Sequence, residues 1–381
     1  MTYSRLIDKF TELFGKGGVM YASPGRINLI GEHTDYNGGY VLPAAIDKVT
    51  ALVIKPNGLN NIRAFAIDLN DLAEIDVAVK PSKQWPRYIY GVVTEILKFG
   101  LSVEGFDCVF GGNVPLGAGL SSSAALESAF AFALNDLFKL GLTKYDLAKI
   151  GQAAEHNAVG VRCGIMDQFA SIFGQKGHLI QLDCRSLDYE LIPFNPEGFR
   201  VVLLDTRVKH SLALSEYNVR RAECEAGVAT VKRQYPTIEL LRDVTMDMLS
   251  EFKHTLPEST YRRCSYVIEE NQRLLNACDA LKRSDYETFG AMMYGSHEGL
   301  SFKYNVSCEE LDYLVAAAQS SGVLGARMMG GGFGGCTINL ISNDRYEVFL
   351  AHARESYKSE FGKEPTVYEV AIGQGARRID V

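Results

Sequence analysis

The chain has 381 residues, of which 47% are hydrophobic, and its formal net charge is −7. This length favours two domains, and the apolar content is enough for ordinary buried cores. The modest, evenly spread negative charge argues against binding to nucleic acid or to an anionic membrane. No uncharged apolar run approaches the roughly 18 to 20 residues that a membrane span needs.

The N-terminal segment "MTYSRLIDKFTELFGKG" carries charges every few residues and predicts a short amphipathic helix without the apolar core of a signal peptide. Eight cysteines are scattered along the chain without a C-x-x-C pair, which argues against a zinc site and a disulfide framework. We therefore expect a cytoplasmic protein with reduced thiols.

A predicted strand, "VMYAS", leads into "SPGRINLIGEHTDYNGG", a segment rich in polar side chains. The glycines at 31, 38 and 39 predict a loop. The side chains of interest are Arg26, Glu32, His33, Asp35, Tyr36 and Asn37. Acidic groups, a histidine and an amide together suit the binding of several hydroxyls, as in a sugar. A solvated surface turn is the alternative interpretation.

Three predicted strands follow, "VTALVIK", "NIRAFAI" and "EIDVAV", because β-branched residues roughly alternate in them. A helical period covers residues 87–99, and "FDCVFGGNVP" predicts a strand that runs into a glycine-rich loop. The helix predicted at 124–135 has Glu127 as its only charge, so we expect it to be buried nearly all round.

The loop itself reads "PLGAGLSSSAALESAF" and joins that strand to the buried helix. The N–H groups and dipole of a helix start favour an anion. Gly117 and Gly119 allow the backbone to approach a phosphate, and the serines can add hydroxyl groups. A plain turn capped by Ser121 is the alternative. A P-loop is excluded, since G-x-x-x-x-G-K-[ST] is absent from the sequence.

Two carboxylates stand out after a helix predicted at 144–157. Asp167, in "CGIMDQFASIF", lies in the first turn of a predicted helix, where the dipole keeps it ionised; a capping role is the alternative. Glu155 lies near a helix C-terminus, where a carboxylate is disfavoured unless a cation is near. This position makes Glu155 a candidate metal ligand, with a surface glutamate as the alternative.

The rest of the chain is predicted as the strands "HLIQLD" and "RVVLLDT", four helices between about residues 215 and 319, and the late strands "TINLIS" and "TVYEVAI". This order indicates α+β domains, and "SLDYELIPFNPEG" predicts a boundary near 185–200. The cluster "MMGGGFGGC" contains G-x-G-x-x-G, but a helix is expected before it and a strand after it, which excludes a dinucleotide fold.

Taken together, these segments resemble the galactokinases of the GHMP small-molecule kinase family. The galactokinase signature is resembled by "SPGRINLIGEHTDY" and the family's phosphate loop by "PLGAGLSSSAALE". The catalytic segment is resembled by "CGIMDQ" and the third family motif by "MMGGGFGGC". A further segment similar to galactokinases is "EYNVRRAEC". The resemblance implies an α+β fold of two domains, a ribosomal-S5-domain-2-like one at 1–190 and a ferredoxin-like one at 191–381, with the active site in the cleft between them. One departure is Met329, where the family usually has threonine.

The resemblance implies ATP-dependent phosphorylation of the anomeric hydroxyl of D-galactose to galactose 1-phosphate, the first committed step of galactose breakdown in the Leloir pathway. Asp167 would be the base and Arg26 would stabilise the transition state. The sugar would be bound by Glu32, His33, Asp35, Gly164, Asp167 and Tyr217. The ATP phosphates would be held by Gly117, Ala118, Gly119, Leu120, Ser121, Ser122 and Ser123. Ser123 and Glu155 would hold Mg²⁺, with Ser122 as the alternative hydroxyl.

The expected partners are these small molecules, with no nucleic acid and no membrane, and the protein is expected to be a monomer. Two other functions stay open. One is a kinase for N-acetylgalactosamine or a related sugar, because the motifs do not define the space around C2. The other is a non-catalytic galactose and ATP sensor, although the intact serine loop, Asp167 and Arg26 favour an enzyme.

Overall fold

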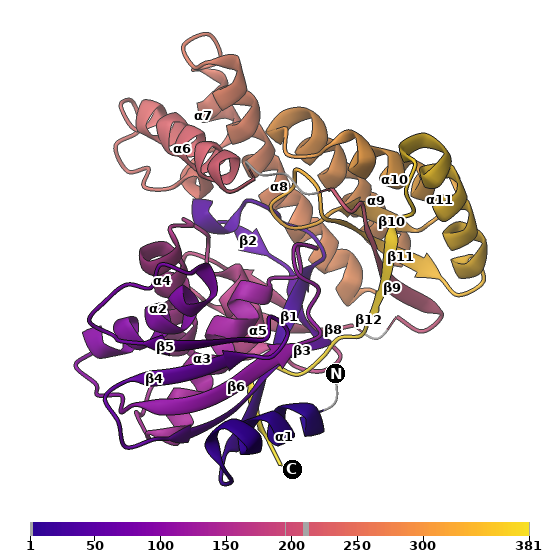
Figure 1. Cartoon of the computed structure of the whole chain (residues 1–381). Helices are drawn as coiled ribbons and strands as arrows, with labels where there is room; N and C mark the ends of the chain where they lie inside the picture. The colour runs from indigo at the N-terminus through magenta and orange to yellow at the C-terminus, as the bar shows by residue number, and fades with distance from the viewer. Residues whose placement is uncertain (1–2, 195, 209–212, 381) are drawn as a thin grey trace.

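The structure is a computed structural model that describes residues 3–194, 196–208 and 213–380, with the side chains of 213–215 outside the description. Within this part of the chain, three sheets of six, four and three strands are surrounded by helices (Figure 1). No helix in the described ranges is long and apolar enough to cross a bilayer.

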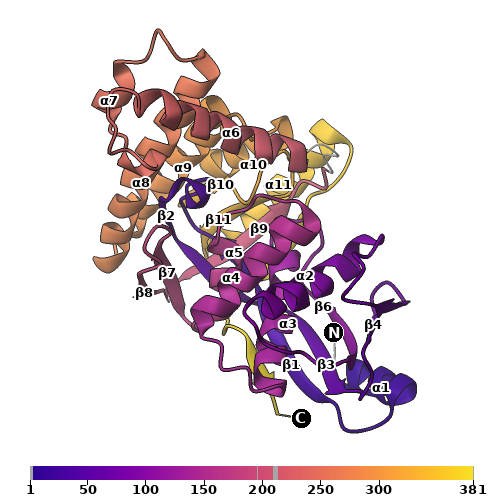
Figure 2. The ribbon, with the colours of Figure 1, turned by 90° about the vertical axis from the view of Figure 1, so that its left-hand side faces the viewer.

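The first domain is built on the six-stranded sheet, whose order is β13-β1-β3-β6-β4-β5. Its strands are β1 (Val19–Asn28), β3 (Pro43–Pro56), β4 (Ile62–Ala66), β5 (Asp71–Ile75), β6 (Phe106–Gly112) and β13 (Arg377–Ile379). β4 and β6 pair in parallel and the other neighbours are antiparallel. Because β13 pairs with β1, the end of the chain returns to the first domain (Figure 2).

Helices cover both faces of this sheet. One face carries α2 (Gln84–Lys98), α3 (Ser122–Leu137), α4 (Lys144–Ala154) and α5 (Met166–Phe173), and the other carries α1 (Tyr3–Phe14). The predicted N-terminal amphipathic helix is confirmed, since Leu6 and Phe10 of α1 pack on Met20 and Val53. The burial expected for α3 is also confirmed, because residues 124–131 are buried without interruption.

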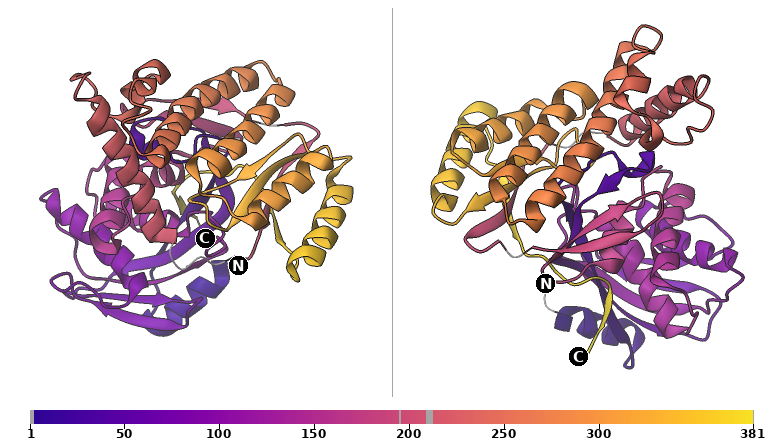
Figure 3. Two further views of the ribbon diagram at one scale, coloured as in Figure 1. Left: turned by 90° about the horizontal axis from the view of Figure 1, so that it is seen from above. Right: turned by 180° about the vertical axis from the view of Figure 1, so that it is seen from behind.

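The second domain contains the four-stranded antiparallel sheet in the order β10-β11-β9-β12. Its strands are β9 (Phe199–Asp205), β10 (Gly325–Met328), β11 (Cys336–Ser342) and β12 (Thr366–Val370). Its helices are α6 (Ala213–Val231), α7 (Met246–Ser250), α8 (Glu258–Lys282), α9 (Tyr286–Glu298), α10 (Glu309–Ser320) and α11 (Tyr346–Phe361). α9 and α10 contact the sheet, while α6 and α7 pack beside α8 (Figure 3).

The two domains share a hydrophobic core. Leu29 and Leu120 from the first domain pack in one cluster with Leu274, Phe289 and Ile338 from the second. A three-stranded sheet of β2 (Tyr40–Val41), β7 (His178–Asp183) and β8 (Tyr189–Pro193) lies in this region. Short helical turns are η1 (Asp35–Asn37), η2 (Glu155–Val159), η3 (Leu241–Asp243) and η4 (Gly299–Tyr304). This packing holds segments far apart in the sequence around one cleft.

Three local expectations were wrong. The first residues of the segment expected to be a loop, 23–28, belong to β1, because their backbone groups pair with β3. A strand, β10, directly precedes the third glycine cluster where a helix was expected; the cluster therefore joins two strands, which still excludes a dinucleotide fold. Only Glu74 and Ile75 of "EIDVAV" are in a strand. The boundary between residues 190 and 191 stays a prediction, and residue 195 within its segment lies outside the described residues.

Candidate active site

Arg26 lies at an irregularity in β1, where the register with β3 shifts between Pro24 and Arg26. Its guanidinium forms a bidentate pair with Asp167, from Nε to Oδ1 at 2.7 Å and from Nη2 to Oδ2 at 3.0 Å. Its third nitrogen, Nη1, donates to the carbonyl of Gly119 at 2.5 Å. Burial lowers the pKa of Arg26, but the charges of Asp167, Glu32 and Asp35 outweigh this effect and raise the pKa overall. One cation therefore joins strand β1, helix α5 and the glycine-rich loop.

The glycine-rich loop reaches the same place through its serines. Ser121 has a left-handed backbone with φ 56°, and its side chain caps no helix N–H. Its hydroxyl donates to Oδ2 of Asp167 at 2.5 Å, so the interpretation of Ser121 as a plain helix cap was wrong. Gly117 and Gly119, with φ 76° and 77°, adopt the backbone region that glycine allows without strain. Ala118 and Leu120 are buried and anchor the loop in the shared core.

Two cavities meet at this loop. A cavity of about 250 Å³ lies at the Arg26–Asp167 pair, and its wall includes Glu32, His33, Asp35, Tyr217 and Glu155. A larger one, about 840 Å³, is lined mainly by apolar and aromatic side chains such as Trp85 and Phe110. Ser123 lines both cavities and Ser122 lines the larger one. The sizes and linings suit a small polar ligand next to a larger, flatter one.

Asp35, which lines the small cavity, packs directly against Gly164, a predicted sugar-contact residue that does not itself line this cavity. A Cβ atom on Gly164 would lie 1.9 Å from Oδ2 of Asp35, so only glycine permits this approach. Burial raises the pKa of Asp35 to about 7, and the negative charge of Asp167 adds to the effect. The carboxyl of Asp35, which accepts one hydrogen bond from the backbone N–H of Tyr36, is thus held at a site where its charge is disfavoured until a further donor arrives.

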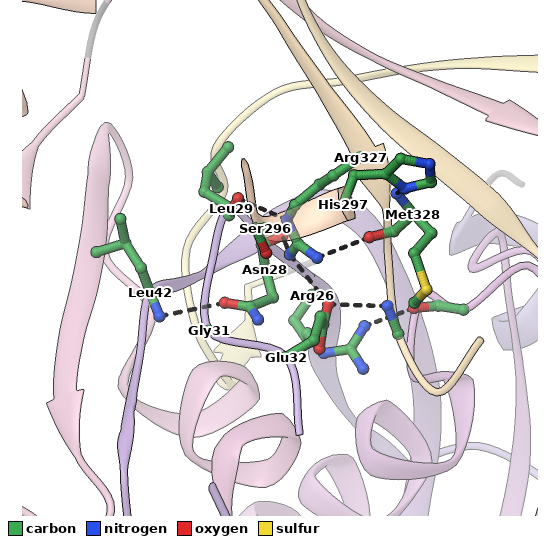
Figure 4. Close-up of polar contacts among 12 residues, drawn as sticks. Arg26, Asn28, Leu29, Gly31, Glu32, Leu42, Ser296, His297, Arg327 and Met328 are labelled. Atoms are coloured by element: carbon green, nitrogen blue, oxygen red, sulfur yellow. Dashed lines mark hydrogen bonds and ion pairs between the residues drawn. The ribbon is translucent and has the colours of Figure 1, made fainter. Parts of the chain in front are cut away.

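Glu32 is held from the second domain. Its Oε1 accepts from the backbone N–H of Gly330 at 2.8 Å and from Nη2 of Arg327 at 3.1 Å (Figure 4). Arg327 is fully buried, and it also donates to the carbonyls of Leu29, Asn28 and Met328. The expectation of a solvated surface turn was wrong for this segment, since Glu32 and His33 are 2% and 3% exposed.

Two ring side chains, His33 and Tyr217, also line the cavity. The rings of His33 and Tyr217 lie with centroids 5.2 Å apart, although Tyr217 comes from α6 in the second domain. Burial lowers the pKa of His33 to about 3, so the imidazole is neutral at physiological pH. The cavity is therefore lined by several carboxyl groups, one guanidinium and a neutral histidine.

Glu155 lies at the start of η2, beside a second buried carboxylate, Glu127 of α3. The side-chain amide of Gln168 donates to Glu127 at 3.0 Å and to Glu155 at 3.5 Å. Burial raises the pKa of Glu155 to about 7 and also raises that of Glu127, whose Oε1 has no hydrogen-bond partner among the described residues. The interpretation of Glu155 as a surface glutamate was wrong, because it is 7% exposed.

The side chains of Glu155 and Ser123 suit a divalent cation that takes only a few of its ligands from the protein. Glu155 interacts with the Ser123 hydroxyl, which lines both cavities. Among the described residues, no three histidine, cysteine or acidic side chains form a metal cluster. One carboxylate and one hydroxyl suit Mg²⁺, which keeps waters and phosphate oxygens as its other ligands.

The structure thus brings predicted residues from five sequence segments around one cleft: the signature segment, the phosphate loop, Glu155, the segment of Asp167, and Tyr217. Sequence reasoning missed three residues that hold them there, namely Arg327, Gln168 and, as a partner of Glu155, Glu127. Glu127 had a signal in the sequence, because it is the one charge in an otherwise apolar helix. Gln168 ends the segment "CGIMDQ" but had no assigned role, and Arg327 lies in a strand whose pattern does not distinguish it.

Comparison with known proteins was consistent across sequence and structure. Three protein-family profiles match: the galactokinase galactose-binding signature at residues 8–56, the GHMP kinases N terminal domain at 87–175 and the GHMP kinases C terminal domain at 277–358. The chain is 41% identical over 378 residues to a galactokinase of Roseiflexus sp. (strain RS-1), covering 98% of this chain and 96% of the relative. It is 43% identical over 358 residues to a galactokinase of Thermotoga petrophila, covering 94% and 99%.

A solved structure of Lactococcus lactis galactokinase complexed with galactose superposes with a TM-score of 0.94 at 34% identity, covering 99% of each chain. A Methanococcus jannaschii mevalonate kinase superposes with a TM-score of 0.66 at 18% identity, covering 94% of this chain and 99% of that one, and so shares the fold. The predicted two-domain α+β fold is confirmed by these likenesses together with the matched N- and C-terminal domains.

Proposed function

This chain belongs to the galactokinases of the GHMP kinase family, and from that premise we propose how its cleft carries out the reaction. The enzyme phosphorylates galactose with ATP as the phosphoryl donor. The observation that carries the proposal is the bidentate Arg26–Asp167 pair, joined by Ser121, in the wall of the small cavity, which shares Ser123 with the large one.

We place galactose in the small cavity and ATP in the large one. The small cavity has the volume and the polar groups for one sugar ring. The large cavity offers Trp85, Phe110 and Leu126 to the adenine ring, and its wall reaches the serines of the phosphate loop. Residues 117–123 would then face the phosphates, where the N–H groups at the start of α3 favour negative charge.

Asp167 would accept the proton of the anomeric hydroxyl as the oxygen attacks the terminal phosphorus, giving galactose 1-phosphate. The carboxylate receives three hydrogen bonds, from Arg26 and Ser121, which hold it in one orientation. Such bonds weaken a base, so Asp167 would act chiefly because it is positioned, while Arg26 compensates the charge that develops on the hydroxyl oxygen and the phosphoryl group.

Asp35 would accept from a sugar hydroxyl, and Glu32, His33 and Tyr217 would complete the sugar contacts. Because Glu32 and His33 are buried and Asp35 and Tyr217 are partly buried, an epimer that leaves one of these groups unpaired should be rejected strongly. Mg²⁺ would be held by Ser123 and Glu155, where it would neutralise charge on the ATP phosphates when bound. The proposal that Mg²⁺ binds here rests on the buried Glu127 and Glu155 carboxylates, which lie in contact with each other.

The deciding experiment is a comparison of steady-state kinetics with galactose, N-acetylgalactosamine, galactosamine and glucose, with product identified by ³¹P NMR. We expect galactose to have the highest kcat/KM and its product to carry phosphate on C1. A higher kcat/KM for N-acetylgalactosamine, or phosphate at another carbon, would contradict the proposal. We also propose a cytoplasmic monomer, which size-exclusion chromatography with light scattering would test.

A further inference from the structure

A chain of buried and partly buried hydrogen bonds runs from the small cavity into the second domain. Nδ1 of His33 lies 2.7 Å from the hydroxyl of Tyr36, which lies 2.8 Å from the hydroxyl of Tyr304. That hydroxyl lies 3.3 Å from Sγ of Cys224. The four residues come from the segment after β1, from η1, from η4 and from α6. The sugar contact expected at His33 is therefore backed by Tyr36 and Cys224, which lie in recognised segments but had no assigned role, and by Tyr304, which lies outside them.

The far end of this chain is rigidly held. Tyr304 is fully buried, and its ring lies between those of His33 and Tyr266, with centroid distances of 4.8 and 4.9 Å. The guanidinium of Arg220 donates to the backbone carbonyls of Tyr304 at 3.1 Å and Asn305 at 2.8 Å. The hydroxyl of Tyr304 thus has a defined position from which it sets the orientation of its neighbour.

His33 must carry one ring proton, because burial keeps the imidazole neutral. If Tyr36 donates to Nδ1, that proton resides on Nε2; if Tyr36 accepts, it resides on Nδ1. Nε2 is a buried atom that makes no hydrogen bond of normal geometry among the described residues, and His33 lines the small cavity. The backbone of Gly331, in the same cavity wall, lies close enough to the imidazole to raise its pKa in part. The direction of the tyrosine chain therefore decides whether this nitrogen offers the ligand a donor or an acceptor.

The composition of the cavity favours a donor. Glu32, Asp35 and Asp167 place carboxyl oxygens in the cavity wall, where they would accept from hydroxyls of a bound sugar. Side-chain donors are fewer, because three of the five N–H groups of Arg26 are engaged by Asp167 and the Gly119 carbonyl. A sugar hydroxyl that gives its proton to a carboxylate still has an oxygen that can accept. An N–H on Nε2 of His33 would serve such an oxygen.

We propose that Tyr36 and Tyr304 are positioning residues that hold His33 in its Nε2–H form, so that the imidazole donates a hydrogen bond to one hydroxyl oxygen of the bound sugar. In this arrangement Cys224 donates to Tyr304, Tyr304 donates to Tyr36, and Tyr36 donates to Nδ1 of His33. The inference rests on the proposed placement of galactose in the small cavity.

The first test reads the tautomer directly, without sugar. In the ligand-free enzyme labelled with ¹⁵N-histidine, long-range ¹H–¹⁵N spectra distinguish the two neutral forms, and a His33→Gln variant assigns the signals. We expect His33 to be in the Nε2–H form, and Tyr36→Phe and Tyr304→Phe to shift it towards a mixture. Tyr357→Phe is the matched control, because it removes a buried hydroxyl that bonds to the Thr206 carbonyl away from the cavity. A proton on Nδ1 in the parent enzyme would overturn the proposal.

The second test links the tautomer to the sugar. We expect Tyr36→Phe to raise the KM for galactose about tenfold and Tyr304→Phe to raise it about threefold, with kcat within twofold, because the lost contact is a binding contact. With a series of monodeoxygalactoses, the penalty should vanish for the one sugar that lacks the bonded hydroxyl. Equal penalties for every deoxy sugar, or an unchanged KM, would refute the proposal. A parent enzyme that did not turn over galactose would instead contradict the proposed function and leave the tautomer result standing.

Discussion

The replacement Asp167→Asn tests the proposed base most directly. Asparagine keeps the shape of the side chain but has no basic carboxylate, so the general-base contribution should be lost. Such a contribution is typically about 10²- to 10⁴-fold in rate, or about 3 to 5 kcal/mol of barrier. We therefore expect kcat to fall at least a hundredfold at saturating galactose and ATP, measured by coupled detection of ADP.

The same replacement should leave the protein folded. Arg26 is 4% exposed, and the loss of a fully buried charge partner would cost several kcal/mol. Two features reduce that cost here. The side chain of Asp167 is 26% exposed, and removal of its charge lowers the pKa of Asp35, which lies in the same cavity and then provides a negative charge near Arg26. We expect a loss of about 1 to 3 kcal/mol in unfolding free energy, as for a hydrogen bond to a charged group.

The control is Asp136→Asn, which removes a carboxylate that accepts from Tyr21 and Lys139 outside the cleft. Its kcat should stay within twofold of the parent value. Calorimetry should show that galactose still binds to the Asp167→Asn variant. A kcat within tenfold of the parent, in a variant that is folded and binds galactose, would refute the assignment of Asp167 as the base.

Three further changes test other parts of the cleft. Glu155→Gln should raise the Mg²⁺ concentration for half-maximal activity at least tenfold. The control is Glu95→Gln, which alters a buried carboxylate bonded to Lys98 and Asn157 and should not change this concentration. An unchanged Mg²⁺ titration for Glu155→Gln would count against Glu155 as a ligand. Gly164→Ala should raise the KM for galactose at least tenfold and leave the KM for ATP within twofold, because the new Cβ must displace Asp35. Equal changes in the two KM values would contradict this reasoning. Asp35→Asn should change how stability depends on pH. The pKa of Asp35 is about 7 in the folded protein and 3.8 ordinarily, as in an unfolded chain. Between these values the folded protein retains a proton that the unfolded chain has released, so the free energy of unfolding falls as the pH rises from 4 to 7. Urea midpoints at pH 5 and pH 7 should therefore differ less in the variant than in the parent, and an equal difference would show that Asp35 is not the group responsible.

Local features of the site could be predicted from the sequence because each has a local physical cause. Gly117 and Gly119 adopt positive φ, as a glycine-rich phosphate loop requires. The single charge at Glu127 predicted that α3 is buried on all sides. The order of four motifs was enough to predict the family and, with it, the two-domain fold. Expectations failed where pairing overrides local composition, as at residues 23–28, which join β1 despite their glycine and proline.

The partners of these residues were decided only by the tertiary structure. Ser121 bonds Asp167 across 46 residues of chain, and Arg327 bonds Glu32 across 295. Glu127 was recognised as a buried charge, yet nothing in its helix indicated that it would lie against Glu155. A hydroxyl, a guanidinium or a carboxylate has many possible partners within a chain, and which one it meets depends on how strands and helices pack around the shared core. The sequence alone therefore specified the chemical groups of the cleft and the backbone that carries them, whereas packing decided which groups hold one another in place.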